Sequence, residues 1–347
     1  MSMLLGIILF WCVVWALIGP LISPWIEKRL EWFILGVGLL AATLSWSWSE
    51  VLIVEALMRP LKVCGAILAG SLLFSFSHDN LTAGVQRLVK KTGLRPAVGV
   101  SVLLVGVAAS FLTTVVAVLV LVELLGAMRL ERKAEVAVAV LGCFAIGLGG
   151  GVTPIAGPVP AIVMAKLAGA PYAVGTSYLV LLIGPWILPP ILSLAIVAGL
   201  LFAQPAPGQY RPPEEDPLSL WTILLLTGKM YVFIAGLVLL GGGLVPLIDR
   251  FLIGASPWLL YWINSVSAVI DGATLASVEI SPLMTQAQIR YILIGLLIAG
   301  GALVTGNAPN LVAAHKLKIP HREWARVGLP IGALLMVFYF LSLVVWS

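Results

Sequence analysis

Apolar residues fill long stretches of the chain in which no charged side chain occurs. A helix of about 20 apolar residues is long enough to cross a lipid bilayer, and several of these stretches reach that length. The pattern therefore predicts an all-α polytopic membrane protein. The uncharged stretches are 3–26, 32–49, 96–122, 136–165, 167–210, 230–248, 251–270, 291–314 and 327–347.

Glycine and proline interrupt two of these apolar stretches. The segment GLGGGVTPIAGPVP, residues 147–160, holds five glycines and three prolines, a composition that a regular helix does not accommodate. We expect a half-helix that ends near Gly149, an unwound turn at 150–157 and a second half-helix from about Pro158. Gly306 and Pro309 interrupt the later stretch in the same way. The predicted discontinuous transmembrane helices are 136–168 and 291–318.

A third apolar stretch, within 96–126, has the polar sequence SFLTT at its middle and basic residues, Arg95 and Arg129, beyond both ends. Lys and Arg collect on the cytoplasmic side of membranes, so both ends are expected on one side. This favours a re-entrant hairpin with SFLTT at its tip. The alternative is one long tilted helix whose hydroxyl groups bond to its own backbone. A second hairpin is predicted at 256–283, which also has polar residues at its centre.

The order of these elements occurs twice. A short span, a polar-tipped segment, a broken helix and a further span follow one another in both halves, and Val152-Thr153 corresponds to Val304-Thr305. With a hairpin in each half, each copy crosses the membrane an odd number of times, which inverts the second copy relative to the first. The expected divisions are N-terminal scaffold helices at 1–60, repeat 1 at 61–202, a Pro-rich linker at 203–217 and repeat 2 at 218–347.

Composition agrees with this class of protein. The chain is 61% hydrophobic and 10% charged, whereas soluble domains are about 25% charged. The net charge of +5 lies in short loops, so we interpret it as an orientation signal and expect no nucleic-acid partner. Residues 50–62 mix charged and apolar side chains and are expected at the interface, before a short span at 63–77 and a basic amphipathic segment at 78–95.

The predicted path is a multi-pass one through a prokaryotic cell (inner) membrane. It places residues 27–29 and 315–326 inside and both termini outside. Arg59 and Lys62 are exceptions, because the same path puts them outside. The first apolar run is expected to be a retained helix and not a signal peptide.

One carboxylate, Asp271, lies deep in an apolar stretch. An ionisable residue inside the membrane is costly and marks a candidate functional site. Small polar side chains surround it in the sequence or occupy the corresponding parts of the first half. Their oxygen atoms suit hard cations such as sodium. The candidate ion-binding residues are Asp271, Asn264, Ser267, Thr274, Thr305, Asn307, Asn310, Ser110, Thr113, Thr114 and Thr153.

Each candidate has a structural alternative. Asp271 could form an ion pair with Lys229, although Lys229 more simply marks the interface where a span begins. The threonine and asparagine side chains could cap the ends of the broken helices. Ser110, Thr113 and Thr114 could serve close helix packing. Glu279 ends an apolar run and is expected at the interface.

Three motifs carry a resemblance to a known group. SAVIDGAT, residues 267–274, is similar to the second-hairpin motif of NhaD-type sodium/proton antiporters, and GNAPN, residues 306–310, resembles the matching unwound helix. SFLTT is similar to the first-hairpin tip. Over 61–347 the chain resembles the ion transporter superfamily and its small branch of predicted cation transporters. The resemblance implies an inverted-topology repeat with two re-entrant hairpins, two discontinuous helices and bound sodium. Gly272 stands where the family motif has asparagine.

Two transport functions are consistent with these features. One is a sodium (cation)/proton antiporter with Asp271 as the shared site, and the other is a sodium-coupled carrier of a small anion. A lone buried carboxylate favours the first, and the absence of an arginine from the predicted core weakens the second. No hydrolase, kinase or redox motif occurs, so we expect neither an enzyme nor a cofactor beyond the ion. The expected partners are the lipid bilayer, a small inorganic ion and, as a candidate assembly, a second copy of the chain.

Overall fold

The computed structural model describes residues 3–175, 177–206, 220–252, 256–265 and 272–346. Within these ranges every regular secondary-structure element is a helix, which confirms the all-helical prediction. In the part of the chain that the structure describes, three helical segments are long and apolar enough to cross a membrane: Tyr178–Phe202, Thr227–Pro246 and His321–Trp346. The length and composition of these segments are those of a membrane protein.

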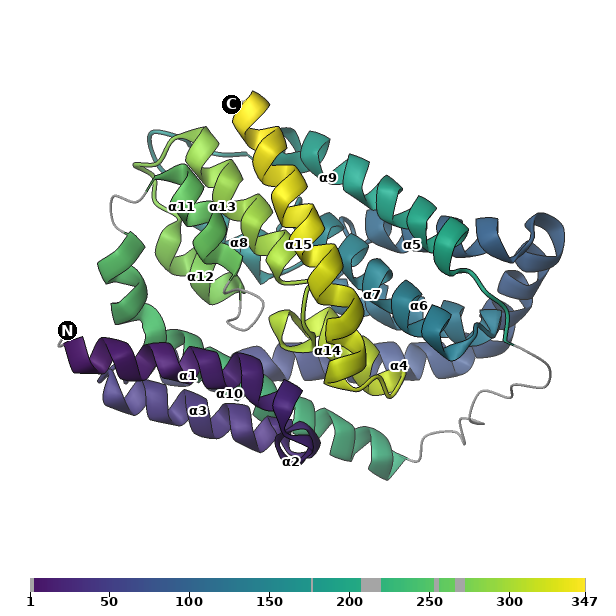
Figure 1. Cartoon of the computed structure of the whole chain (residues 1–347), viewed down its shortest axis with the longest axis horizontal. Coiled ribbons are helices and arrows are strands. Elements are labelled where there is room, and N and C mark those ends of the chain that lie inside the picture. Colours follow the sequence, from purple (N-terminus) through teal and green to yellow (C-terminus); the bar gives the residue numbers. More distant parts are fainter. Residues whose placement is uncertain (1–2, 176, 207–219, 253–255, 266–271, 347) are drawn as a thin grey trace.

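Five helices make one layer of the molecule, seen in the lower part of Figure 1. In this layer α3 packs along α10, α1 packs against α3, and α4 packs against the other part of α10. The helices are α1 (Met3–Ile22), α2 (Pro24–Lys28), α3 (Leu30–Leu44), α4 (Glu50–Thr92) and α10 (Leu220–Leu252).

Glycines bring α3 and α10 into backbone contact. A Cβ atom added at Gly236 of α10 would lie 2.6 Å from the Leu35 nitrogen and 2.8 Å from the Ile34 carbonyl carbon. One at Gly243 would lie 2.5 Å from Ala42 nitrogen. Small residues on facing helices allow this approach, a common form of helix association in membranes.

The remaining helices form the second layer. The chain passes through α5 (Leu94–Ala108), α6 (Thr114–Met128), α7 (Arg132–Gly149), α8 (Pro158–Lys166) and α9 (Tyr178–Val197), which ends in a π-helical turn, Ala198–Phe202. After α10 it continues through α11 (Pro257–Ile263), α12 (Gly272–Glu279), α13 (Gln286–Ala299), a 3₁₀ turn (Val304–Gly306), α14 (Ala308–Lys316) and α15 (His321–Trp346).

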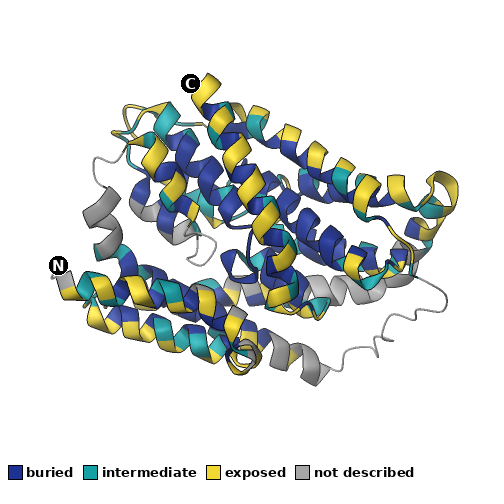
Figure 2. Cartoon of the chain, in the orientation of Figure 1, coloured by how far each residue is buried: buried dark blue, intermediate teal, exposed yellow. Residues whose placement is uncertain are grey.

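Helices α7 and α13 lie at the centre of this layer. Most residues of both are buried, including Phe144 and Ile146 of α7, and Figure 2 shows α7 buried along most of its length. Around them, α5 packs on α7 and α9, while α11 packs on α13 and α13 packs on α15. The helix that follows each break packs against the other half of the chain: α14 packs on α6, and α8 packs on α12.

The first helix break lies where the glycine and proline pattern predicts it. Helix α7 ends at Gly149, and α8 begins at Pro158 after a non-helical segment. The second break begins earlier than expected, at Gly300, because two successive glycines end α13 there. Pro309 lies in the first turn of α14, a position where the missing N–H of proline costs no hydrogen bond.

Two other elements differ in form from the sequence expectation. Residues 50–92 form the single helix α4 with Pro60 in its interior, in place of an interfacial segment, a span and an amphipathic segment. Proline removes one backbone hydrogen bond and kinks a helix without having to end it. Residues 96–122 form two helices, α5 and α6, that pack against each other, so they are not one long helix.

Substituting Gly236 by alanine tests the close contact between α3 and α10. The added Cβ atom meets the backbone of α3, and overpacking costs about 1–3 kcal/mol. We expect Gly236→Ala to lower the midpoint of thermal unfolding in detergent. The control is Gly126→Ala, at an exposed position of α6 with no atom within 4 Å of the new Cβ. An unchanged midpoint for Gly236→Ala would contradict the contact.

Candidate functional site

A cavity of about 680 Å³ lies where the two helix breaks meet the layer formed by α4 and α10. The first break contributes Pro154 to Gly157, and the second contributes Gly306 and Asn307. Thr113 and Thr114, between α5 and α6, also line the cavity, as does Gly272 at the start of α12. The cavity therefore brings together segments from both halves of the chain.

Helix ends of both polarities border this cavity. The first residues of α8 and of α14, including Pro158 and Ala308, line it, as do Gly150 at the end of α7 and Gly300 at the end of α13. The partial positive charge of a helix N-terminus favours anions, and the partial negative charge of a C-terminus favours cations. The backbone alone thus offers sites for either sign of charge.

Asparagine side chains hold the second break in place. Asn310 is fully buried, and its Nδ2 donates hydrogen bonds to the carbonyl oxygens of Gly300 at 2.9 Å and Leu303 at 2.7 Å. Asn307 caps α14, because its Oδ1 accepts from the Asn310 backbone N–H at 3.0 Å. Asn310 therefore compensates carbonyl groups released where α13 unwinds, and Asn307 combines the capping role with a place on the cavity wall.

The first break is tied to the segment between α5 and α6. The Ser110 hydroxyl donates to the Gly149 carbonyl oxygen at 2.9 Å, and the Thr153 hydroxyl donates to the Ser110 carbonyl oxygen. The Thr114 backbone N–H donates to the Ala156 carbonyl oxygen at 3.0 Å. Thr113 caps α6 by accepting from the Val116 N–H. These bonds fix the two irregular segments against each other.

The structure thus separates the candidate residues by role. Thr113, Thr114 and Asn307 line the cavity, whereas Ser110, Thr153 and Asn310 hold its walls. Thr305 is buried in the 3₁₀ turn. Asp271 and Ser267 lie outside the described residues, as does the side chain of Thr274.

Asn264 lies apart from the cavity-lining residues, next to a carboxyl group. It is fully buried, its Nδ2 donates to the Leu260 carbonyl oxygen at 2.9 Å, and its side chain interacts with Glu279. Glu279 is 4% exposed, and neither of its carboxyl oxygens has a well-formed hydrogen bond within the described part of the chain. The fold therefore covers the end of α12, and the expected place of Glu279 at the membrane interface stays a prediction.

Sequence reasoning also missed the contribution of α4. Val54, Glu55, Met58 and Arg59 line the cavity, so an arginine lies at the candidate site. The spacing i, i+1, i+4 and i+5 places these residues on one face of a helix. The interpretation of 50–62 as interfacial, which rested on its mixture of charged and apolar side chains, did not place this helix face at a cavity.

Lys229 belongs to a different part of the molecule. Its ammonium group lies 3.5 Å from a carboxylate oxygen of Glu31, and its side chain is 47% exposed. The apolar segment Thr227–Pro246 begins two residues before it. These observations agree with the interpretation that Lys229 marks the start of a span.

Fold and cavity together define a helical protein with the character of a membrane protein, in which a mostly apolar cavity with a few polar residues lies between two broken helices. Within that class, the chain belongs to the family described as protein of unknown function (DUF1646), which matches residues 4–346. No curated protein matches the chain.

Asn310→Ala tests the support of the second break. The substitution removes the side-chain donor from two carbonyl oxygens, and a buried polar group left unsatisfied costs about 1–3 kcal/mol. We expect a lower midpoint of thermal unfolding in detergent. Ser342→Ala is the control, because it removes an exposed hydroxyl that bonds only to its own helix. Equal midpoints for the two variants would show that Asn310 does not hold the break.

Proposed function

We propose that this protein is a multi-pass membrane transporter of small ions that works by alternating access. The observation that carries the proposal is that both helix breaks and the segment between α5 and α6 line the same cavity. Irregular backbone at membrane depth is tolerated where it is buried in protein or lines a water-filled space. Discontinuous helices that aim their ends at a central site are typical of secondary transporters.

The packing of the helices supports an inverted repeat. Helix α5 packs on α7 as α11 packs on α13, and α4 packs on α6 as α10 packs on α12. The contacts between the halves also correspond: α14 of the second half packs on α6 of the first, and α8 of the first half packs on α12 of the second. Two copies of one unit related by a pseudo-two-fold axis produce this pattern of corresponding contacts.

The lengths of α5 and α6 support a re-entrant hairpin. Each has 15 residues, or about 22 Å at 1.5 Å per residue, and the hydrocarbon core is about 30 Å thick. Helices of this length that pack on each other suit a segment that enters and leaves the membrane on one side.

Cysteine labelling tests the hairpin. Lys91 at the end of α4 and Lys133 at the start of α7 are both exposed and lie beyond the two ends of the hairpin. Single cysteines at these positions, in a variant without Cys12, Cys64 and Cys143, should react with an impermeant maleimide from the same side of the membrane. Labelling from opposite sides would show that residues 94–128 cross the membrane.

For the transported ion we propose cation/proton exchange at Asp271. Gly272, which follows Asp271 in the chain, lines the cavity. A carboxylate in a desolvated site gains a proton more readily, and a bound cation favours its charged form. Competition between a proton and a cation such as sodium for one carboxylate is sufficient for exchange, provided the empty charged site does not cross.

A specific observation favours a second candidate, the sodium-coupled carrier of a small anion. Arg59 lines the cavity, and the N-termini of α8 and α14 border it. A guanidinium group and helix N-termini both attract oxyanions and carboxylates. The second candidate therefore rests on groups that the first does not use.

Reconstitution into liposomes with an internal pH dye separates the two candidates. We expect a sodium gradient to drive proton movement in the wild type and Asp271→Asn to abolish it. Glu131→Gln, which removes a carboxylate without a capping role at the start of α7, should behave as the wild type. Proton movement retained by Asp271→Asn would refute the assignment. Sodium-driven uptake of sulfate or a dicarboxylate, lost in Arg59→Gln, would instead establish the anion carrier.

A further inference from the structure

A second cavity, of about 760 Å³, lies between the turn that joins α1 to α3 and the first part of α10. Its lining changes in character from one end to the other. Charged and aromatic side chains from α2 and the start of α3 line one end, with Lys229 of α10, and apolar residues of α3 line the other. We propose that this cavity binds one anionic phospholipid, with the phosphate group at the charged end and an acyl chain along α3.

The charged end carries a net positive charge. Among the side chains that the structure describes, Lys28, Arg29 and Lys229 line it together with one acid, Glu31, so these three cations and one anion give +2. Glu31 is paired with Lys229 at 3.5 Å. The guanidinium of Arg29 lies over the Trp25 ring at 5.1 Å from its centroid, an attractive arrangement that positions the cation. Basic pockets between membrane helices are typical binding sites for anionic lipid head groups.

The apolar end follows one face of α3. Phe33, Gly36, Val37 and Leu40 line the cavity at the spacing i, i+3, i+4 and i+7, which is a single helix face about 10 Å long. Gly36 leaves this face open, because no atom lies within 4 Å of a Cβ atom placed there. A free phosphate would not need this apolar face, whereas an acyl chain next to a phosphate group would occupy it.

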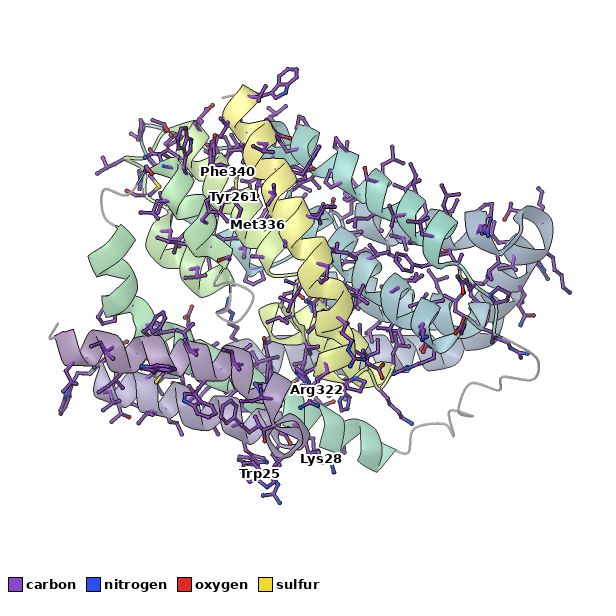
Figure 3. The ribbon with its side chains drawn as sticks, in the orientation of Figure 1. Trp25, Lys28, Tyr261, Arg322, Met336 and Phe340 are labelled. Atoms are coloured by element: carbon purple, nitrogen blue, oxygen red, sulfur yellow. The ribbon has the colours of Figure 1, made fainter. Side chains whose placement is uncertain are left out.

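The depth of the cavity also fits a lipid. Trp25 and Trp32 are 62% and 60% exposed, and exposed tryptophans are enriched at the level of the head groups. Lys229 stands at the start of an apolar span. Figure 3 shows Trp25 and Lys28 pointing away from the body of the molecule at this end, with Arg322 nearby. Arg322 donates to the Ile22 carbonyl oxygen at 2.9 Å and so ties α15 to the same end.

The proposal requires only that the chain is embedded in a membrane, so it is independent of the transported ion. Native mass spectrometry of the full chain in detergent, with added phosphatidylglycerol or phosphatidylcholine, tests it directly. We expect the wild type to retain phosphatidylglycerol in preference to phosphatidylcholine. The double variant Lys28→Gln/Arg29→Gln should bind phosphatidylglycerol about 25-fold more weakly, at about fivefold for each cation removed. Lys90→Gln/Lys91→Gln is the matched control, because it removes two cations at the exposed end of α4.

A second variant separates a phospholipid from the other occupants. Gly36→Leu fills the open part of the α3 face and leaves every charge in place, and it should also abolish retention of phosphatidylglycerol. Retention unchanged in Gly36→Leu but lost in Lys28→Gln/Arg29→Gln would show a site for the phosphate group alone and overturn the proposal. A shift from dimer to monomer in both variants, with no change in bound lipid, would identify a second copy of the chain as the occupant.

Discussion

Backbone polar groups that a broken helix leaves buried must be satisfied by other partners, and the second layer of this fold depends on that constraint. Each break releases carbonyl groups that α7 or α13 would otherwise bond within the helix. In the second break the Asn310 side chain satisfies two of them. In the first, Ser110 and Thr153 connect the break to the segment between α5 and α6. The hydrogen bonds of these polar residues thus hold the two breaks in place.

The same constraint explains why the breaks lie deep in the protein. Most residues of helices α7 and α13 are buried, and each of these two helices packs against several others. The layer of α3 and α10 has the opposite character, with regular helices held by glycine contacts and an outer face of exposed apolar side chains.

Local chemistry made the first break predictable from the sequence. Glycines and prolines act on their own backbone, so the end of α7 at Gly149 and the start of α8 at Pro158 followed from composition alone. The sequence prediction placed the second break too late, because it used Gly306 and Pro309 as the interrupting residues. In the structure α13 already ends at Gly300, and Pro309 lies in the first turn of α14. Arg59 could not be placed, since its position on the cavity wall depends on how α4 packs against distant parts of the chain.

The cavity walls contributed by α4 and α10 differ in chemistry although the two helices occupy corresponding places in the packing. Helix α4 brings Glu55 and Arg59, whereas α10 brings only apolar side chains, among them Phe233 and Leu237. The backbone of the two breaks offers both carbonyl and amide groups, so it does not by itself select the sign of an ion. Under the proposed function, selectivity for an ion would come from charged side chains, Arg59 on α4 and the carboxylate of Asp271 in the later part of the chain. Proteins with the same backbone fold can have different functions because the side chains of their sites differ.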